Sequence, residues 1–167
     1  MKKVGIVMGS DSDFSFLEDT VKTLKKFGIP YDASVISAHR NPDKLHDWAA
    51  SLLSEGYGVL IAAAGGAAHL PGVLAAQTPL PVIGVPVPNG PLNGVDALYS
   101  ICQMPAGIPV ATVGVGLGGA VNAAVLAAKI LAVNDEDLMN KVIEYKNELK
   151  VKNDLKNDSL QEKLKNL

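Results

Sequence analysis

Apolar and polar positions along the chain follow two alternating periods. Short, continuous apolar runs of the kind found in buried strands cover residues 3–8, 31–36, 58–64, 81–85 and 109–113. Between them, apolar residues recur at helical spacing, as at Leu17, Val21, Leu24 and Phe27, and Gly28 is a typical helix stop. Further helices are predicted near residues 42–55, 67–77, 94–104 and 118–133. The helix near residues 42–55 begins at a cap formed by Asn41-Pro42 and is expected to bury Leu45, Trp48, Ala49, Leu52 and Leu53.

This strand–helix rhythm, repeated five times, predicts one α/β domain over residues 1–133. Buried strands that alternate with helices favour a parallel sheet with right-handed crossovers and helices on both faces. The expected fold is therefore a three-layer α/β/α sandwich, a doubly wound, flavodoxin-like sheet. In such sheets ligands bind outside the carboxyl ends of the strands, where the loops into the following helices gather.

Residues 134–167 differ from this domain in composition. Almost half of the Lys, Arg, Asp and Glu residues of the chain lie there. Asn134 or Asp135 is expected to cap a helix that carries Leu138, Val142, Tyr145 and Leu149 and frays beyond Lys150. This C-terminal tail helix lies either across a neighbouring subunit or free in solvent.

The middle of the chain is nearly free of charge, since Asp96 is the only charged residue from Gly56 to Ala128. A monomer of this size still exposes about a third of the surface of its unfolded chain. Part of this apolar surface is therefore expected to meet other subunits. The alternative is a monomer with an unusually Ala- and Gly-rich core.

Overall composition narrows the class of protein. A net charge of −2 gives no field that attracts nucleic acid or an anionic membrane surface. No apolar stretch has the length of a membrane span, and the first residues resemble a strand rather than a secretory signal. The single Cys102 excludes an internal disulfide. We expect a soluble, cytoplasmic protein that binds neither nucleic acid nor membrane.

The loop Gly9-Ser-Asp-Ser-Asp13 leaves a predicted strand and opens a helix. Free backbone N–H groups and the hydroxyls of Ser10 and Ser12 make this position a candidate phosphate site. Aspartate would repel phosphate, so Asp11 or Asp13 is expected to cap the helix or to accept hydrogen bonds from sugar hydroxyls. A capping segment without ligand is the equally supported alternative.

The loop Ser37-Ala-His-Arg40 ends the second predicted strand and holds the only arginine of the chain. A guanidinium binds phosphate or carboxylate through paired hydrogen bonds, and histidine can transfer a proton near neutral pH. His39 and Arg40 are therefore candidates for proton transfer and anion binding. A surface loop that caps the next helix is the alternative.

The loop Gly65-Gly-Ala-Ala-His-Leu-Pro-Gly72 follows the third predicted strand. Its glycines allow the backbone to approach a ligand closely, and His69 offers a second polar contact. A histidine that only caps the turn is the competing interpretation.

Three other features are given no functional role. The glycines of Gly114-Val-Gly-Leu-Gly-Gly119 have dinucleotide-site spacing, but they follow the last strand and lack a suitably placed acidic partner, so close helix packing explains them better. Cys102 is expected in the core, and His46 is expected in solvent. No metal-ligand spacing and no nucleoside-triphosphate motif is found, so neither metal nor cofactor is predicted.

Taken together, the loops resemble those of the PurE family of purine biosynthesis, in its class I form, 5-(carboxyamino)imidazole ribonucleotide mutase. The resemblance runs from Val4 to Val133. Beyond the loops it includes Pro81-Val-Ile-Gly-Val-Pro-Val87, Gly94-Val-Asp-Ala-Leu-Tyr-Ser-Ile101, Gln103-Met-Pro105, Gly107-Ile-Pro-Val110 and Asn122-Ala-Ala124.

The resemblance implies a cofactor-free isomerase that moves a carboxylate from an exocyclic amine to a ring carbon, and a homo-octamer whose sites combine subunits. By this resemblance His39 is the general acid/base and His69 a second catalytic histidine. Arg40 and the serines would hold the phosphate and Asp13 the ribose. The remaining residues implied to line the pocket are Ser37, Ala38, Gly65 and Leu70.

The segment Pro88-Asn-Gly-Pro91 departs from the family pattern, and this departure leaves the loop contacts near the pocket open. Three rival functions also remain open at this point. They are a direct aminoimidazole ribonucleotide carboxylase that uses free CO2, a related carboxylase of a pyridinium nucleotide, and a non-catalytic ribonucleotide-binding module.

Overall fold

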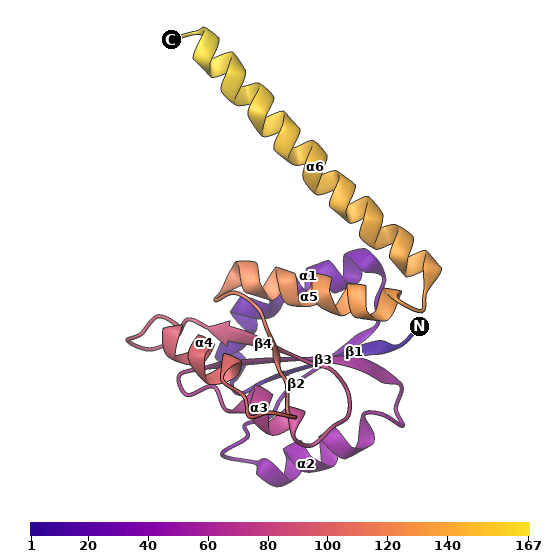
Figure 1. Ribbon diagram of the computed structural model, residues 1–167. Helices are drawn as coiled ribbons and strands as arrows, with labels where there is room; N and C mark the ends of the chain where they lie inside the picture. Colours follow the sequence, from indigo (N-terminus) through magenta and orange to yellow (C-terminus); the bar gives the residue numbers. More distant parts are fainter.

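The computed structural model describes residues 1–167 and confirms the alternation of strands and helices (Figure 1). The strands are β1 (Lys3–Met8), β2 (Tyr31–Val35), β3 (Tyr57–Gly65), β4 (Val82–Val87) and β5 (Ala111–Thr112). A short 3-10 turn, η1 (Asp11–Asp13), precedes the first helix. The helices are α1 (Phe14–Phe27), α2 (Pro42–Ser51), α3 (Leu70–Ala75), α4 (Val95–Cys102), α5 (Leu117–Ala132) and α6 (Glu136–Lys165).

All five strands are parallel, in the order β2-β1-β3-β4-β5. The chain passes from β1 to β2 on one side and then returns to place β3 on the other side of β1. This is the flavodoxin-like order, and its change of direction lies between β1 and β3, where the following loops diverge and leave a crevice. The predicted fold is confirmed.

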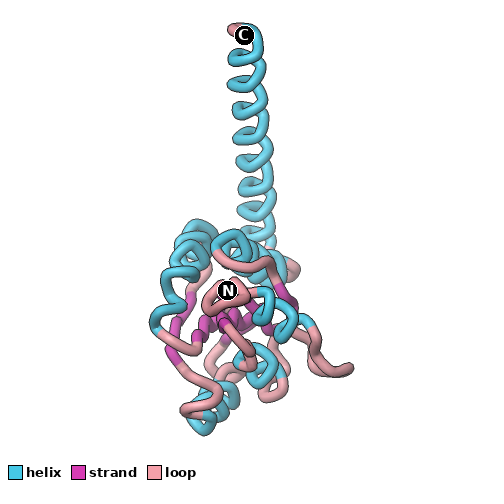
Figure 2. The backbone as a smooth tube through the Cα atoms, turned by 90° about the vertical axis from the view of Figure 1, so that its left-hand side faces the viewer, coloured by secondary structure: helices cyan, strands magenta, loops and turns pink.

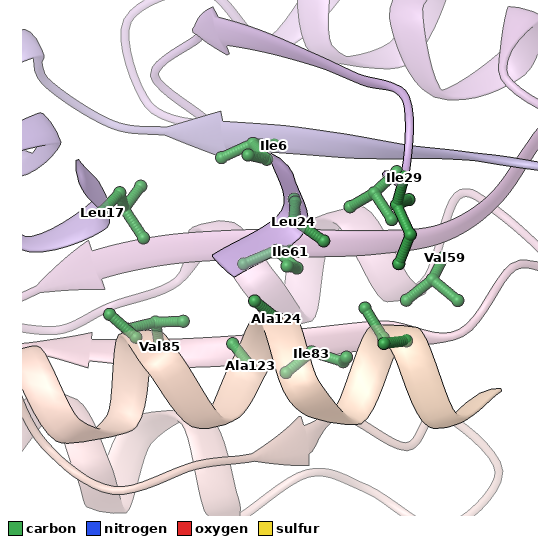
Figure 3. Packing of buried hydrophobic residues seen from close by; sticks show 14 of the residues in the cluster. Ile6, Leu17, Leu24, Ile29, Val59, Ile61, Ile83, Val85, Ala123 and Ala124 are labelled. Atoms are coloured by element: carbon green, nitrogen blue, oxygen red, sulfur yellow. The ribbon is translucent and has the colours of Figure 1, made fainter. Parts of the chain in front are cut away.

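Helices cover both faces of the sheet (Figure 1). α1 and α5 pack on one face, where Leu17 and Leu24 meet Ile6, Ile61 and Ile83 and the alanines of α5 (Figure 3). α2, α3 and α4 cover the other face through a second buried cluster that includes Leu45, Leu74 and Ile101. Small alanines let α5 lie close to the strands, so the sheet is buried on both sides.

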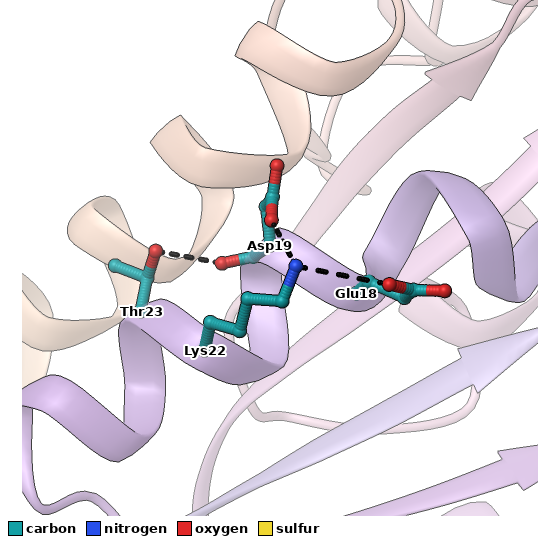
Figure 4. A network of polar contacts seen from close by, with 4 residues as sticks. All are labelled: Glu18, Asp19, Lys22 and Thr23. Carbon is teal, nitrogen blue, oxygen red and sulfur yellow. Dashed lines mark hydrogen bonds and ion pairs between the residues drawn. The ribbon is translucent and has the colours of Figure 1, made fainter.

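α1 shows how the sequence pattern sets one element. Its buried positions include Leu17, Leu24 and Phe27, and it ends at Gly28, whose φ of 71° is left-handed. On its polar face, Lys22 Nζ lies 2.9 Å from Asp19 Oδ1 and 3.7 Å from Glu18 Oε2 (Figure 4). The helix therefore presents one face to the core and one to water.

Several predicted details differ from the structure. β5 pairs with β4 only at Ala111 and Thr112, and Pro109 before them has no N–H for a ladder hydrogen bond. Leu53 lies beyond the end of α2 and is exposed rather than buried. Cys102 was expected in the core, and this prediction is wrong: it is exposed, because the inward face of α4 carries Ala97 and Ile101 instead.

The C-terminal helix α6 is capped by Asp135, whose Oδ1 accepts a hydrogen bond from Leu138 N at 3.0 Å. Its first turns pack on the α/β domain next to the end of α1. The centroids of the Tyr145 and Phe27 rings lie 5.2 Å apart, and Lys26 forms an ion pair with Glu148. The fraying predicted beyond Lys150 is wrong, since the helix continues to Lys165. This last part projects away from the domain (Figures 1 and 2), and residues 151–167 are exposed.

None of these helices combines the length and the apolar character needed to cross a bilayer.

Candidate active site

The three predicted loops meet in one cleft of about 360 Å³ at the carboxyl ends of the strands. They follow β1, β2 and β3, which are adjacent in the sheet, so the cleft lies at the change of direction between β1 and β3. Every residue predicted for the site lines this cleft. These residues are Ser10, Ser12, Asp13, Ser37, Ala38, His39, Arg40, Gly65, His69 and Leu70.

The loop after β1 is held by a capping box. Ser10 Oγ accepts from Ser12 N at 3.3 Å, and Asp13 Oδ2 accepts from Ser10 N at 3.2 Å. Asp13 thus has the capping role that the sequence left open, and it also lines the cleft, whereas Asp11 does not. The arrangement leaves the serine hydroxyls beside the cleft.

Asp13 is the only carboxyl that lines the cleft. Its residue is 5% exposed, and this burial raises the pKa of the Asp13 carboxyl. The hydrogen bond from Ser10 N–H lowers this pKa in part, because it favours the charged form. The negative charge of the neighbouring Asp11 raises the pKa further.

The loop after β2 is a tight turn that presents Arg40 to solvent. Ser37 accepts two backbone hydrogen bonds, at Oγ from Arg40 N (3.3 Å) and at its carbonyl from Asn41 N (2.9 Å). Asn41 Oδ1 then caps α2 by accepting from Lys44 N at 3.2 Å. Arg40 forms no salt bridge within the chain, so its guanidinium is available to an anion.

The two histidines of the site contact each other. His39 Nε2 lies 2.8 Å from His69 Nδ1, and the two rings stand edge to face at 88°. They come from the loops after β2 and β3, which flank β1. One nitrogen of the pair donates and the other accepts, so the contact sets the two tautomers jointly.

His69 reaches this position because the loop after β3 turns sharply. Ala68 N donates to Gly65 O at 3.1 Å, and both Gly66 (φ 62°) and Ala68 (φ 41°) are left-handed. A positive φ at alanine is uncommon and strained, and such strain often marks a functional site. The sequence interpretation missed Ala68 because alanine signals no such turn.

Two cleft residues, Ala64 and Asn89, lie outside the three predicted loops and were not found from the sequence. Asn89 lies in the segment Pro88–Pro91 that departs from the family pattern. That departure was the only signal that could have identified it.

The features rejected at the sequence level lie elsewhere. Gly119 packs on the backbone of Gly114, where a Cβ would overlap the carbonyl oxygen, and this contact explains the glycine spacing. His46 is exposed on α2 outside the cleft. No group of His, Cys, Asp and Glu residues in the structure is arranged to hold a metal ion.

Comparison with known proteins gives consistent similarities. The AIR carboxylase family model matches residues 3–152. An N5-carboxyaminoimidazole ribonucleotide mutase of Pyrococcus abyssi is 53% identical over 150 residues, which are 90% of this chain and 85% of the relative. The mutase of the same name from Saccharolobus solfataricus is 48% identical over 98% of this chain and 99% of its own length. In structure, PurE of Treponema denticola superposes with a TM-score of 0.83 at 30% identity, covering 93% of this chain and 96% of that chain.

Proposed function

This chain belongs to the AIR carboxylase family, and we propose that it catalyses the reaction for which its relatives are named. It is an isomerase of purine biosynthesis, an N5-carboxyaminoimidazole ribonucleotide mutase. Its substrate is a small ribonucleotide that carries a carboxylate on an exocyclic amine. The product carries the same carboxylate on a carbon of the imidazole ring.

The paired histidines beside a free arginine are the observation that best supports this chemistry. A carbamate loses CO2 readily once its nitrogen is protonated, so His39 can donate that proton and release bound aminoimidazole ribonucleotide and CO2. The ring carbon then attacks CO2, and His39 removes the proton from that carbon. The nitrogen–carbon bond is exchanged for a carbon–carbon bond, and His39 regains the proton it gave.

His69 supports this cycle through its 2.8 Å contact with His39. When one imidazole gains a proton, the neighbouring ring nitrogen accepts a hydrogen bond from it. The reaction needs no metal or cofactor, because the carboxylate that leaves one atom of the substrate returns to another.

The remaining cleft residues bind and enclose the ribonucleotide. Arg40, Ser10, Ser12 and Ser37 are assigned to the phosphate, which the guanidinium and hydroxyl groups of these cleft residues suit. Asp13 is assigned to the ribose hydroxyls. Ala38, Gly65 and Leu70 form the apolar wall that keeps CO2 from water.

The protein is further proposed to be a homo-oligomer, an octamer by family resemblance. Exposed apolar side chains cluster on and beside α4, at Leu92, Val95 and Tyr99. The projecting end of α6 also exposes apolar residues. A helical segment as short as this projecting end is only marginally stable in water when nothing packs against it. Contact with a neighbouring subunit would bury both surfaces. A cytoplasmic location stays a prediction.

One comparison of substrates tests the function. Purified protein is supplied either with the carbamate substrate or with aminoimidazole ribonucleotide plus bicarbonate, and formation of the ring-carboxylated product is followed. Rapid turnover of the carbamate is expected. Turnover only with bicarbonate would identify a direct carboxylase, and ligand binding without turnover would identify a non-catalytic module. If neither is converted, a pyridinium nucleotide plus bicarbonate is supplied, and its carboxylation would identify the related carboxylase of a pyridinium nucleotide.

A further inference from the structure

Asn89 lines the active-site cleft but has no part in the reaction described above. It follows β4, the strand next to β3, and its side chain forms no hydrogen bond within the chain. A carboxamide offers two N–H donors and one acceptor oxygen. Asn89 therefore brings an uncommitted polar group into the site.

The carboxamide of Asn89 lies directly over Gly65. In the sheet Gly65 pairs with Val87, so Asn89 stands two residues beyond the partner of Gly65. A Cβ built on Gly65 would overlap the Oδ1, Cγ and Nδ2 atoms of Asn89. The absence of a side chain at Gly65 is thus what admits the carboxamide to the cleft.

The backbone that leads into Asn89 is held by three contacts. Asn89 N donates to Val87 O at 2.9 Å, and Gly116 N donates to Pro86 O at 3.0 Å. Pro88 packs against Gly94, where an added Cβ would lie 3.0 Å from Pro88 Cα. These contacts fix where the Asn89 side chain starts before a ligand arrives, which reduces the entropic cost of binding.

The sheet order separates Asn89 from the arginine of the site. Arg40 follows β2 and Asn89 follows β4, with β1 and β3 between them. The proposed substrate carries two anionic groups, a phosphate and a carboxylate, and Arg40 is the only arginine or lysine that lines the cleft. If Arg40 binds the phosphate, no second guanidinium or ammonium is left for the carboxylate, and the carboxamide on the other side of β1 and β3 is a suitable donor for it.

We propose that Asn89 binds the carboxylate that the reaction moves, by donating a hydrogen bond from Nδ2 to a carboxylate oxygen. This inference rests on the proposed function, and it makes Asn89 a specificity residue of the same site. Asn89 holds the carboxylated forms of the ligand and leaves aminoimidazole ribonucleotide almost unaffected.

The test compares two ligands that differ only in the carboxylate. Dissociation constants of 4-carboxy-5-aminoimidazole ribonucleotide and of aminoimidazole ribonucleotide are measured by calorimetry for wild type, Asn89→Ala and Asn89→Asp. Asn89→Ala should weaken the carboxylated ligand by about tenfold to a hundredfold, the range for a hydrogen bond to a charged group. The affinity for aminoimidazole ribonucleotide should change less than about twofold. Asn89→Asp should weaken the carboxylated ligand further, because it opposes two negative charges.

Asn93→Gly is the matched control. Asn93 lies in the same loop, outside the cleft, and its φ of 49° suits glycine, so both affinities should stay at the wild-type level. Thermal unfolding of each variant checks that the domain is intact. Equal losses for both ligands, or no loss for either, would overturn the role of Asn89.

Failure of the proposed function would be seen separately, in the wild type. A wild-type protein that does not convert the carbamate contradicts the mutase. A wild-type protein that converts it, with an Asn89→Ala variant that binds the carboxylated ligand normally, contradicts only this inference.

Discussion

His39 Nε2 and His69 Nδ1 lie 2.8 Å apart, although 30 positions separate the two residues in the chain. The contact joins the loop after β2 to the loop after β3 across the end of β1. Because each ring orients the other, the pair presents one defined proton donor and acceptor to the cleft.

Replacing His39 tests the proton transfer. His39→Asn keeps a polar side chain of similar size but cannot exchange a proton near neutral pH. Turnover should fall by at least about a hundredfold, the low end for general acid–base catalysis, while ribonucleotide affinity is kept. Steady-state rates and calorimetry measure the two effects. His46→Asn, on the exposed face of α2, should change neither, and near-wild-type turnover of His39→Asn would exclude the assignment.

Replacing Arg40 tests the anion site. Arg40→Ala removes the only guanidinium of the chain, so the affinity for aminoimidazole ribonucleotide should fall by about tenfold to a hundredfold. Arg40→Lys should restore part of the loss, since it keeps the charge without the paired donors. Lys44→Ala, an exposed cation outside the cleft, is the control. Unchanged affinity in Arg40→Ala would contradict a phosphate role.

The buried Asp13 predicts a pH dependence of stability. Burial raises the pKa of Asp13 in the folded state, so between the ordinary and the raised pKa the folded chain binds more protons than the unfolded chain. The contribution of Asp13 to stability is therefore largest below its ordinary pKa and declines as the pH rises through this window.

Asp13→Asn removes the titration but keeps an oxygen that can accept from Ser10 N. As the pH rises from about 3 toward 7, where the aspartate is ionised, the variant should become more stable relative to wild type. Its free energy of unfolding minus that of wild type should therefore increase. Urea unfolding across this range measures the trend. Asp47→Asn, on the exposed face of α2, is the control. A parallel pH profile for Asp13→Asn and wild type would contradict the prediction.

Two neighbouring glycines of α5 should respond in opposite directions to alanine. A Cβ at Gly119 would overlap the Gly114 carbonyl, whereas nothing lies within 4 Å of a Cβ at Gly118. Gly119→Ala should cost about 1–3 kcal/mol through overpacking. Gly118→Ala should gain up to about 1 kcal/mol from helix propensity. Thermal and urea unfolding compare the pair, and equal effects would contradict close packing as the reason for Gly119.

The projecting end of α6 provides the test of subunit contact. Leu155 and Leu160 are more than half exposed, and replacing both with aspartate should weaken the oligomer if they pack on a neighbour. Asn153→Asp with Asn157→Asp adds the same charge at polar positions and should leave assembly intact. Native mass spectrometry measures the oligomer, and an unchanged mass with unchanged thermal stability in the leucine variant would favour a solvated appendage.

The order of the elements follows from local chemistry, and for this reason the sequence predicts it well. β1 was predicted at its observed bounds, and Gly28, Asn41 and Asp135 end or begin helices through their own backbone or side-chain preferences. Parallel strands joined by helices place their loops at one edge of the sheet. The meeting of the three loops in one cleft could therefore be anticipated without coordinates.

Other features depend on which surfaces meet, and local patterns do not record this. The exposure of Cys102 depends on which face of α4 meets the sheet, and the left-handed Ala68 depends on the turn that carries His69. The entry of Asn89 into the site depends on a missing side chain on the adjacent strand.

The sequence by itself therefore determined the fold class, the loops and the residue types of the site, because these arise from periodicity and from interactions between near neighbours in the chain. Only the tertiary structure decided that His39 bonds to His69 and that Asn89 lies over Gly65. Each of these contacts joins residues more than twenty positions apart through a distance of a few ångströms, and only the packing of strands and helices sets such distances.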